Sequence, residues 1–271
     1  MSQDQIGQNE ARTNEAKQSE AQPHEKPLKY DGQSRRVRNC PFPEVSLSAK
    51  YASPEGHNVI VFDCEIKNEI DGKNIGWRDF GRMGHAVSSL YDYRSGDYCI
   101  YFDDNLDRMV ERINEADLVV GFNIVEFDLP LIAVSAKAQL RPDIAMNCYD
   151  MLPVTRRSTG WRAGRFPSGM KLDDHLLAMY GTAGMKSGHG ANAPKLWQEK
   201  KLGELCSYVL RDVNREKALF ESAWYAGQFA TPTHGIKEVE RPQMMLHSLL
   251  MKRSRAFETD AAPQLNQSGA V

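Results

Sequence analysis

Two short runs of β-branched and apolar residues, 58–62 and 118–122, indicate strands near the centre of a sheet. An uninterrupted apolar run of this length is typical of a strand covered on both faces, because neither face meets water. Residues 85–93 and 98–102 have the composition of two more strands, separated by the turn Arg94-Ser-Gly-Asp97. The strands at 58–62, 85–93 and 98–102 are therefore expected to form a meander.

Helical periodicity separates and follows these strands. Residues 105–116 place apolar side chains on one helical face, and a second helix is expected from Leu129 to Leu140. A fifth strand is expected at 145–149, with further helices at 171–180, 202–225 and 243–254. This order of elements predicts an α/β fold with a mixed five-stranded sheet flanked by helices.

Composition divides the chain into a folded domain and its flanks. The first thirty residues are mostly polar and cannot bury enough apolar surface to offset chain entropy. We therefore expect a disordered tail at 1–30, an approach segment at 31–57, the α/β domain at 58–230, a helical C-terminal extension at 231–256 and a second disordered tail at 257–271.

Bulk charge and cysteine usage limit the classes of function. The formal net charge is −2, so any contact with nucleic acid needs a local basic patch. The cysteines are scattered without a Cys-x-x-Cys pair, which argues against a disulfide framework or a zinc site; they are Cys40, Cys64, Cys99, Cys148 and Cys206. No apolar run approaches the ~18 residues of a membrane span, and the chain start lacks a signal peptide. A soluble cytoplasmic protein is expected, with no membrane partner.

Carboxylates follow the two apolar runs. Asp63 and Glu65 are two positions apart, so on a strand both side chains leave the same face. Asp128 follows the second run, and it converges with them if the two strands are neighbours. Adjacent carboxylates repel each other, and a divalent cation relieves the repulsion. The alternatives are a strand end that emerges into solvent and, for Asp128, a helix-start carboxylate favoured by the helix dipole.

Tyr208 and Asp212 are four positions apart in a helical stretch and therefore share one helical face. Tyr208 is alternatively a core residue, and Asp212 is alternatively an ion-pair partner of Arg211 or Arg215. If this face meets the other carboxylates, four of them surround one space. Such a set suits two magnesium ions, which take oxygen ligands.

In chain order, Asp63-Cys64-Glu65, the stretch from Gly121 to Pro130 and Tyr208-Val-Leu-Arg-Asp212 resemble the Exo I, Exo II and Exo III motifs of DEDDy-type DnaQ-like 3′–5′ exonucleases. These enzymes belong to the ribonuclease H-like superfamily. The second and third motifs are especially similar to those of the proofreading domain of family B DNA polymerases. The resemblance covers roughly residues 59–219, and it implies a ribonuclease H-like fold.

The resemblance also implies roles for individual residues. Asp63, Glu65, Asp128 and Asp212 would hold two Mg²⁺ or Mn²⁺ ions, and Tyr208 would position the nucleophilic water. Asn123 and Phe127 would help to hold the terminal nucleotides. The chain departs from the polymerase pattern at Phe122 and Leu131, where tyrosine is common. It shows no polymerase palm motif, so a stand-alone exonuclease is expected.

A basic stretch, 155–171, supports a nucleic-acid partner. It has no acidic residue, and it interleaves aromatics with cations; its members are Arg156, Arg157, Trp161, Arg162, Arg165, Phe166 and Lys171. Cations follow a phosphate backbone while aromatics stack on bases, so Arg156, Arg157, Trp161, Arg162 and Arg165 are candidate substrate-binding residues. A solvated loop fits equally well. Residues 66–84 are either a strand-separating hairpin or, slightly favoured, a surface loop.

The expected function is a metal-dependent 3′–5′ exonuclease that hydrolyses DNA, preferably single-stranded, and releases nucleoside 5′-monophosphates. The preference for DNA follows from the resemblance to proofreading domains. A 3′–5′ exoribonuclease is the alternative within the same class. A non-catalytic nuclease-fold module that binds nucleic acid is the alternative from another class.

Overall fold

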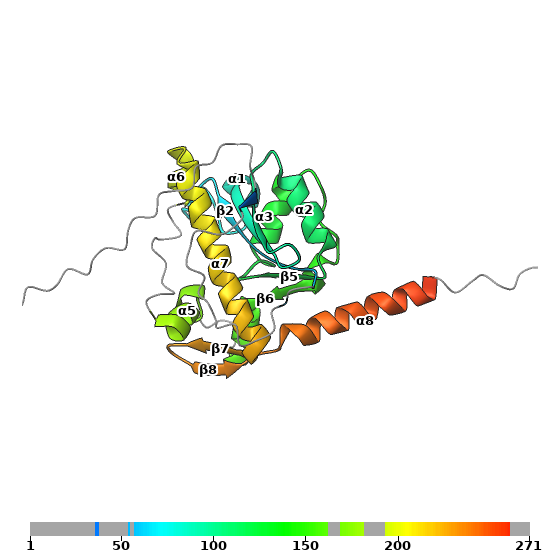
Figure 1. Ribbon diagram of the computed structural model, residues 1–271. Coiled ribbons are helices and arrows are strands. Elements are labelled where there is room, and N and C mark those ends of the chain that lie inside the picture. Colours follow the sequence, from blue (N-terminus) through cyan, green and yellow to red (C-terminus); the bar gives the residue numbers. More distant parts are fainter. Residues whose placement is uncertain (1–35, 38–53, 55–56, 162–168, 182–192, 261–271) are drawn as a thin grey trace, which may run out of the picture.

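The chain folds around a mixed sheet (Figure 1), which the computed structural model shows together with its flanking helices. The structure describes residues 36–37, 54, 57–161, 169–181 and 193–260. The predicted tail at 1–30 and residues 261–271 of the predicted second tail lie outside these ranges. Residues 257–260 are the end of helix α8 (Pro242–Asp260), so this helix passes the predicted boundary at 257.

The sheet has the strand order β1-β4-β3-β2-β5-β6. Its five main strands are β2 (Val59–Ile66), β3 (His85–Asp92), β4 (Asp97–Tyr101), β5 (Leu118–Gly121) and β6 (Cys148–Asp150). The meander β2-β3-β4 is antiparallel, whereas β5 runs parallel to both β2 and β6. The predicted mixed five-stranded α/β sheet is thus confirmed, and the two-residue strand β1 (Arg36–Val37) extends it at the β4 edge.

Strand β2 is interior because its apolar residues are buried on both faces. Val59 and Val61 belong to one core cluster, and Ile60 and Phe62 belong to the other. Each such side chain contributes about 1.5–3 kcal/mol on burial. The strand is longer than the predicted run 58–62, because its pairing with β3 continues through Glu65. Asp63 and Glu65 therefore lie within the strand rather than beyond its end.

Helix α7 (Leu202–Ala226) crosses one face of the sheet (Figure 1) and packs against β2, β3 and β5. Its buried apolar residues, among them Leu205, Val209 and Val213, share a core cluster with Val59 and Val61. The cluster on the opposite face takes its α-helical members from α1 (Phe80–Met83), α2 (Leu106–Glu115) and α3 (Asp128–Ser135). Because strand side chains alternate, Asp63 and Glu65 leave β2 on the same face as Val59 and Val61, toward α7.

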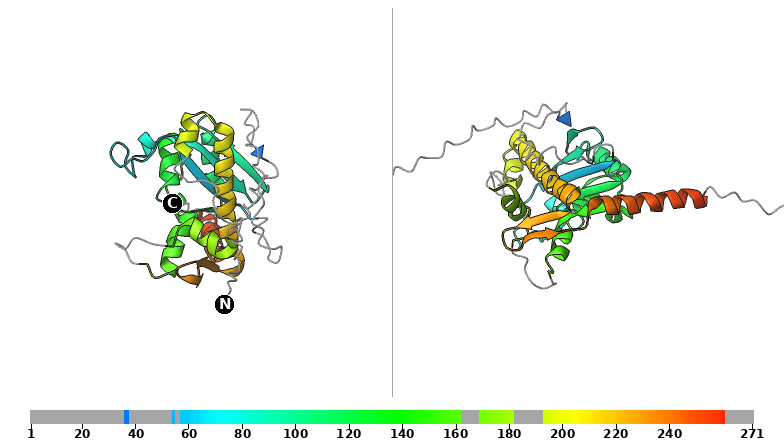
Figure 2. Two further views of the ribbon diagram at one scale, coloured as in Figure 1. Left: turned by 90° about the vertical axis from the view of Figure 1, so that its left-hand side faces the viewer. Right: turned by 60° about the horizontal axis from the view of Figure 1, so that its bottom comes forward.

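The remaining described elements surround this body. They are α1 (Phe80–Met83), the short 3₁₀ helix η1 (Ile144–Asn147), α4 (Met151–Ser158), α5 (Leu172–Tyr180), α6 (Ala193–Gln198), β7 (Gln228–Thr231), β8 (Gly235–Glu238) and α8. The predicted helical extension at 231–256 thus includes strand β8 of the β7–β8 hairpin, and α8 projects from the body (Figure 2). Helix α3 ends at Ser135 rather than near Leu140.

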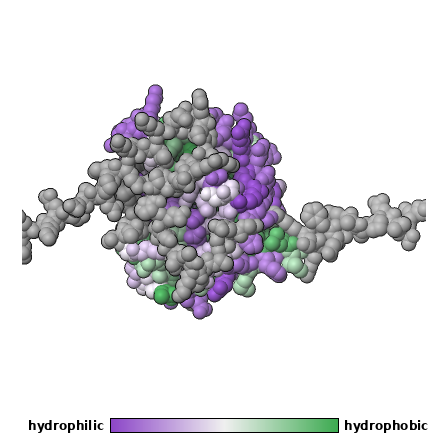
Figure 3. Space-filling view, in the orientation of Figure 1, coloured by the Kyte–Doolittle hydropathy of each residue, from purple (hydrophilic) through white to green (hydrophobic). Residues whose placement is uncertain are grey.

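The described surface over α2 is largely hydrophilic, whereas apolar residues gather along the first part of α8 (Figure 3), where Met244, Leu250 and Met251 are exposed. Among the helices that the structure describes, none combines the length and the apolar character needed to cross a bilayer.

Candidate active site

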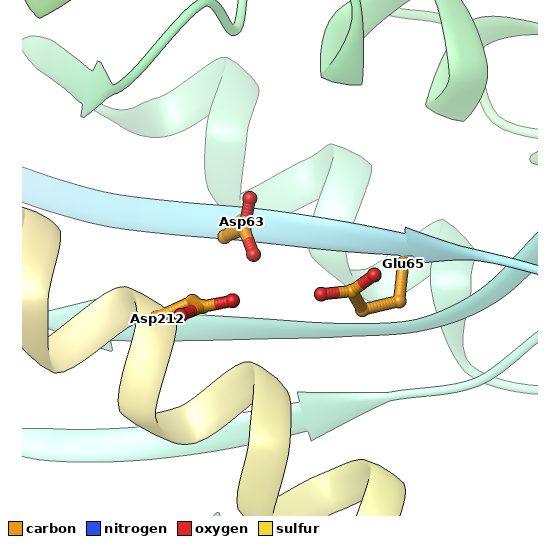
Figure 4. A group of neighbouring side chains, drawn as sticks. All are labelled: Asp63, Glu65 and Asp212. Atoms are coloured by element: carbon orange, nitrogen blue, oxygen red, sulfur yellow. The ribbon is translucent and has the colours of Figure 1, made fainter. Parts of the chain in front are cut away.

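Three carboxylates meet between β2 and α7. Asp63, Glu65 and Asp212 each contribute one oxygen to a group whose members all lie within 4.8 Å of one another. Asp63 and Glu65 project from the strand and Asp212 from the helix, toward the space between the two elements (Figure 4). Such separations let one cation contact more than one of these oxygens, and carboxylate oxygens are the ligands that Mg²⁺ prefers.

Asp128, the first residue of α3, lines the same pocket but does not belong to this group of three. Its Oδ1 accepts a hydrogen bond of 3.0 Å from the backbone N–H of Cys64. Strand β2 pairs with β5 only as far as Val61, so Asp128 occupies the position where a longer β5 would have continued. Burial, reinforced by the nearby Asp150, raises the pKa of Asp128 to about 7.

Asp212 also forms an ion pair within α7. Nη1 of Arg215 lies 3.1 Å from Oδ1 of Asp212, and the same guanidinium contacts Asp173. One alternative from the sequence, the pairing of Asp212 with Arg215, is therefore present in the structure. It does not prevent Asp212 from contributing an oxygen to the carboxylate group. Arg215 instead offsets part of the negative charge beside it.

Tyr208 lines the pocket one helical turn before Asp212. The pKa of its phenol is raised strongly, first by burial and then by Asp212, Glu65 and Asp63. The phenol is therefore protonated at neutral pH, and it can donate a hydrogen bond but cannot act as a base. Tyr208 is therefore both a buried core residue and a part of the pocket wall.

Glu216 is a further carboxylate of the pocket that sequence analysis missed. It lies one turn after Asp212 on α7 and is only 2% exposed. Its Oε1 accepts a hydrogen bond of 3.2 Å from the N–H of Phe122. Burial, followed by the charges of Asp63, Asp128 and Asp212, raises its pKa well above the usual range. The spacing of four from Asp212 was a usable signal, but its charged neighbours Arg215 and Lys217 are typical of a solvated helix face.

Asp150, at the end of β6, fixes the loop that follows β5. Its Oδ1 accepts a hydrogen bond of 2.7 Å from the N–H of Asn123, and its Oδ2 accepts one of 3.1 Å from the N–H of Val125. These bonds hold Asn123 at a φ of 73°, a left-handed conformation that asparagine tolerates. The same carboxylate caps α4 through the N–H of Leu152. The predicted nucleotide-binding residues Asn123 and Phe127 both line the pocket.

Aromatic residues form part of the wall of this pocket, which has a volume of about 310 Å³. The rings of Trp77 and Phe127 are 5.0 Å apart with an interplanar angle of 32°, and Trp77 remains 54% exposed. An ion pair of 3.0 Å between Arg78 and Glu126 joins the same two segments. In the described chain, residues 67–84 contain α1 and no strand. Their role as a strand-separating hairpin or as a surface loop stays a prediction. They carry an aromatic side chain to the pocket.

The basic stretch, 155–171, meets the pocket at Lys171. Arg156 lies with its guanidinium carbon 4.8 Å from the centre of the Trp161 ring, and Arg157 lies 3.8 Å from Glu240. Neither arginine nor Trp161 lines the pocket. Arg162 and Arg165 lie outside the described residues. The structure thus does not bring the described arginines of this stretch to the carboxylates.

No disulfide joins the cysteines of the described chain, which are Cys64, Cys99, Cys148 and Cys206, and Cys40 lies outside it. His175 is buried between the Thr155 hydroxyl, 3.0 Å from its Nε2, and the Ala230 carbonyl, 2.8 Å from its Nδ1. It joins α4, α5 and β7, as expected of a structural histidine.

No protein-family model matches this chain, and no curated protein sequence matches it. The geometry of the pocket and the motifs that line it therefore carry the evidence for function.

Proposed function

We propose that this chain is a metal-dependent 3′–5′ exonuclease of the DEDDy type with a ribonuclease H-like fold, acting preferably on single-stranded DNA. The observation that carries this proposal is the approach of Asp63, Glu65 and Asp212 to within 4.8 Å in a pocket that Asp128 and Tyr208 also line. The residues of all three exonuclease-like motifs thus share one pocket. The direction of degradation and the preference for DNA rest on the resemblance to proofreading exonucleases.

The donor set fits hard divalent cations. All of its carboxylates offer oxygen atoms, and their mutual repulsion in a buried pocket favours a positive ion. Asp63, Glu65, Asp128 and Asp212 would hold two Mg²⁺ or Mn²⁺ ions. When bound, a pair of such ions lowers the pKa of the attacking water and stabilises the leaving oxygen of a phosphodiester.

The protein's own groups orient the reactants. The protonated phenol of Tyr208 donates a hydrogen bond toward the pocket and orients the attacking water, which contributes to rate by positioning. Lys171 and Arg215 bring positive charge to the pocket wall, and this charge offsets that of a phosphate. Phe127 and Trp77 line the same pocket, and bases stack on aromatic side chains of this kind.

An assay on 5′-labelled oligonucleotides tests this function. Single-stranded DNA, duplex DNA and RNA are incubated with the full chain, with Mg²⁺ or with EDTA. We expect a ladder shortened from the 3′ end of the DNA only when Mg²⁺ is present, and a phosphorothioate at the 3′ terminus should slow it. Asp63→Asn and Asp212→Asn should each lower the rate at least ~100-fold, because each weakens the hold on a cation that stabilises developing charge.

Asp143→Asn is the matched control, because this exposed aspartate lies outside the pocket and its variant should keep the wild-type rate. Faster cleavage of RNA than of DNA would make the protein an exoribonuclease. Strand binding without cleavage in any metal would make it a non-catalytic module. Full activity in both pocket variants would overturn the assignment of the site.

A further inference from the structure

Glu216 lies inside the wall of the carboxylate pocket, although it belongs to none of the three motifs. It shares a face of α7 with Asp212, and its side chain reaches the end of β5 beside Gly121. A Cβ atom at position 121 would come 3.4 Å from Oε2 of Glu216, 2.9 Å from the carbonyl oxygen of Phe62 and 2.2 Å from Cγ2 of Ile124. Because position 121 is a glycine, α7 and the carboxylate of Glu216 can lie close to the end of β5.

The two oxygens of Glu216 have different environments. Oε1 accepts the N–H of Phe122 at 3.2 Å, whereas Oε2 is buried and makes no hydrogen bond with any described residue. Among the described residues, no lysine or arginine forms an ion pair with Glu216, and the neighbouring Arg215 pairs with Asp212 and Asp173 instead. A buried carboxylate oxygen without a partner is costly, and proteins rarely retain one unless something binds there.

A cation supplies the missing partner. The carboxyl groups of Asp63, Asp128 and Asp212 are the nearby acidic neighbours of Glu216, and all four residues line one pocket. We propose that Glu216 is a fifth carboxylate of the divalent-cation site, with Oε2 directed to a cation and Oε1 retained by the N–H of Phe122. This inference rests on the cation site of the proposed function. It adds a residue whose role the motif resemblance does not imply.

Binding of Mn²⁺ to the full chain, followed by electron paramagnetic resonance of the free ion and by calorimetry, tests the role of Glu216. Glu216→Gln has nearly the same shape and keeps an acceptor for Phe122, but it removes the negative charge. We expect its affinity for Mn²⁺ to fall about tenfold or more, as for other residues that support a metal site. Glu204→Gln, an exposed glutamate on the same helix, is the matched control and should bind Mn²⁺ as the wild type does.

Glu216→Asp is the second variant, because it keeps the charge but withdraws the oxygens by one methylene group, and it too should bind Mn²⁺ more weakly. Thermal unfolding in EDTA shows whether each variant is folded. Wild-type affinity in either folded variant would overturn the role of Glu216 while leaving the proposed function intact. If the wild type itself failed to bind Mn²⁺, or if Asp63→Asn left binding unchanged, the cation site and the proposed function would fail together.

Discussion

Asp128 illustrates how a single side chain couples the site to stability. Its carboxyl is buried at the start of α3 and accepts a hydrogen bond from a backbone amide, yet burial outweighs that bond and raises its pKa to about 7. In an unfolded chain the same group has a pKa near 4. Between these two values the folded protein binds more protons at Asp128 than the unfolded chain does.

In the metal-free protein, the ionisation of Asp128 should therefore lower the free energy of unfolding as the pH rises from about 4 to about 7. Above about pH 7 this loss should be complete. Each pKa unit corresponds to ~1.4 kcal/mol, so Asp128 should change the free energy of unfolding by a few kcal/mol over this range. Asp128→Asn keeps an acceptor oxygen for Cys64 but cannot ionise. Its free energy of unfolding should fall less over this window than that of the wild type. Urea unfolding in EDTA at about pH 5 and about pH 7.5 measures the difference.

Asp143→Asn serves as the control here too, because this exposed residue should leave the pH dependence of the wild type unchanged. Parallel pH dependences of wild type and Asp128→Asn would show that Asp128 titrates normally in the folded protein.

At the scale of elements, the segment between β2 and β3 brings Trp77 to the pocket wall. Trp77→Ala should weaken the binding of single-stranded DNA by about 1–3 kcal/mol, because one stacking platform is lost. The slope of log affinity against log salt should not change, since stacking releases no counterions. Fluorescence anisotropy with Ca²⁺ in an Asp63→Asn background measures both quantities without cleavage. Trp77→Ala should hydrolyse the p-nitrophenyl ester of thymidine 5′-monophosphate at nearly the wild-type rate.

Trp161→Ala is the companion variant, because Trp161 contacts Arg156 away from the pocket. A comparable loss in this variant would place the basic stretch on the path of the strand, as the sequence suggested. Wild-type binding by Trp77→Ala would remove Trp77 from that path.

The sequence predicted those elements whose stability is encoded locally. Strands β2 and β5 were evident because their β-branched residues are buried on both faces, and α7 because its apolar residues recur along one face. The hairpin β7–β8 was missed because Gln228–Thr231 and Gly235–Glu238 contain few strand-forming residues. Its position depends on tertiary contacts, such as the bond between His175 and Ala230.

The site residues likewise divide into those with a local sequence pattern, which were predicted, and those without one, which were missed. Asp63, Glu65 and Asp212 were found because they follow or interrupt apolar patterns and because their order along the chain matches that of the three motifs. Trp77 was missed because it lies in a polar segment without periodicity. The structure alone shows that Trp77 packs against Phe127, since that contact joins residues fifty positions apart in sequence.

At the scale of the whole molecule, the carboxylates belong to elements that cannot loosen independently. Strand β2 is interior to the sheet and α7 crosses its face, so repulsion among their carboxylates lowers the stability of the whole fold. Mg²⁺ should therefore raise the melting temperature. A cation at about a hundredfold its dissociation constant adds ~2.7 kcal/mol, which corresponds to roughly 5–10 °C for a domain of this size.

Differential scanning fluorimetry with Mg²⁺ and with EDTA measures this shift. The double variant Asp63→Asn/Asp212→Asn should melt at nearly the same temperature in both conditions. An equal shift in wild type and double variant would mean that the ion acts at another place on the protein.

The alternation of side chains along β2 determines both which residues reach the pocket and which residues pack in the core. The two-residue period that directs Asp63 and Glu65 toward α7 also directs Cys64 into the opposite core cluster. Inserting or deleting one residue before Asp63 would exchange these faces, burying charge in an apolar layer and turning a core side chain toward the pocket. Point substitutions can change the chemistry of the pocket one group at a time, but changes in the length of this strand would disrupt the pocket and the fold together. The length of β2 can therefore change in evolution only by steps of two residues, which keep each side chain on its own face.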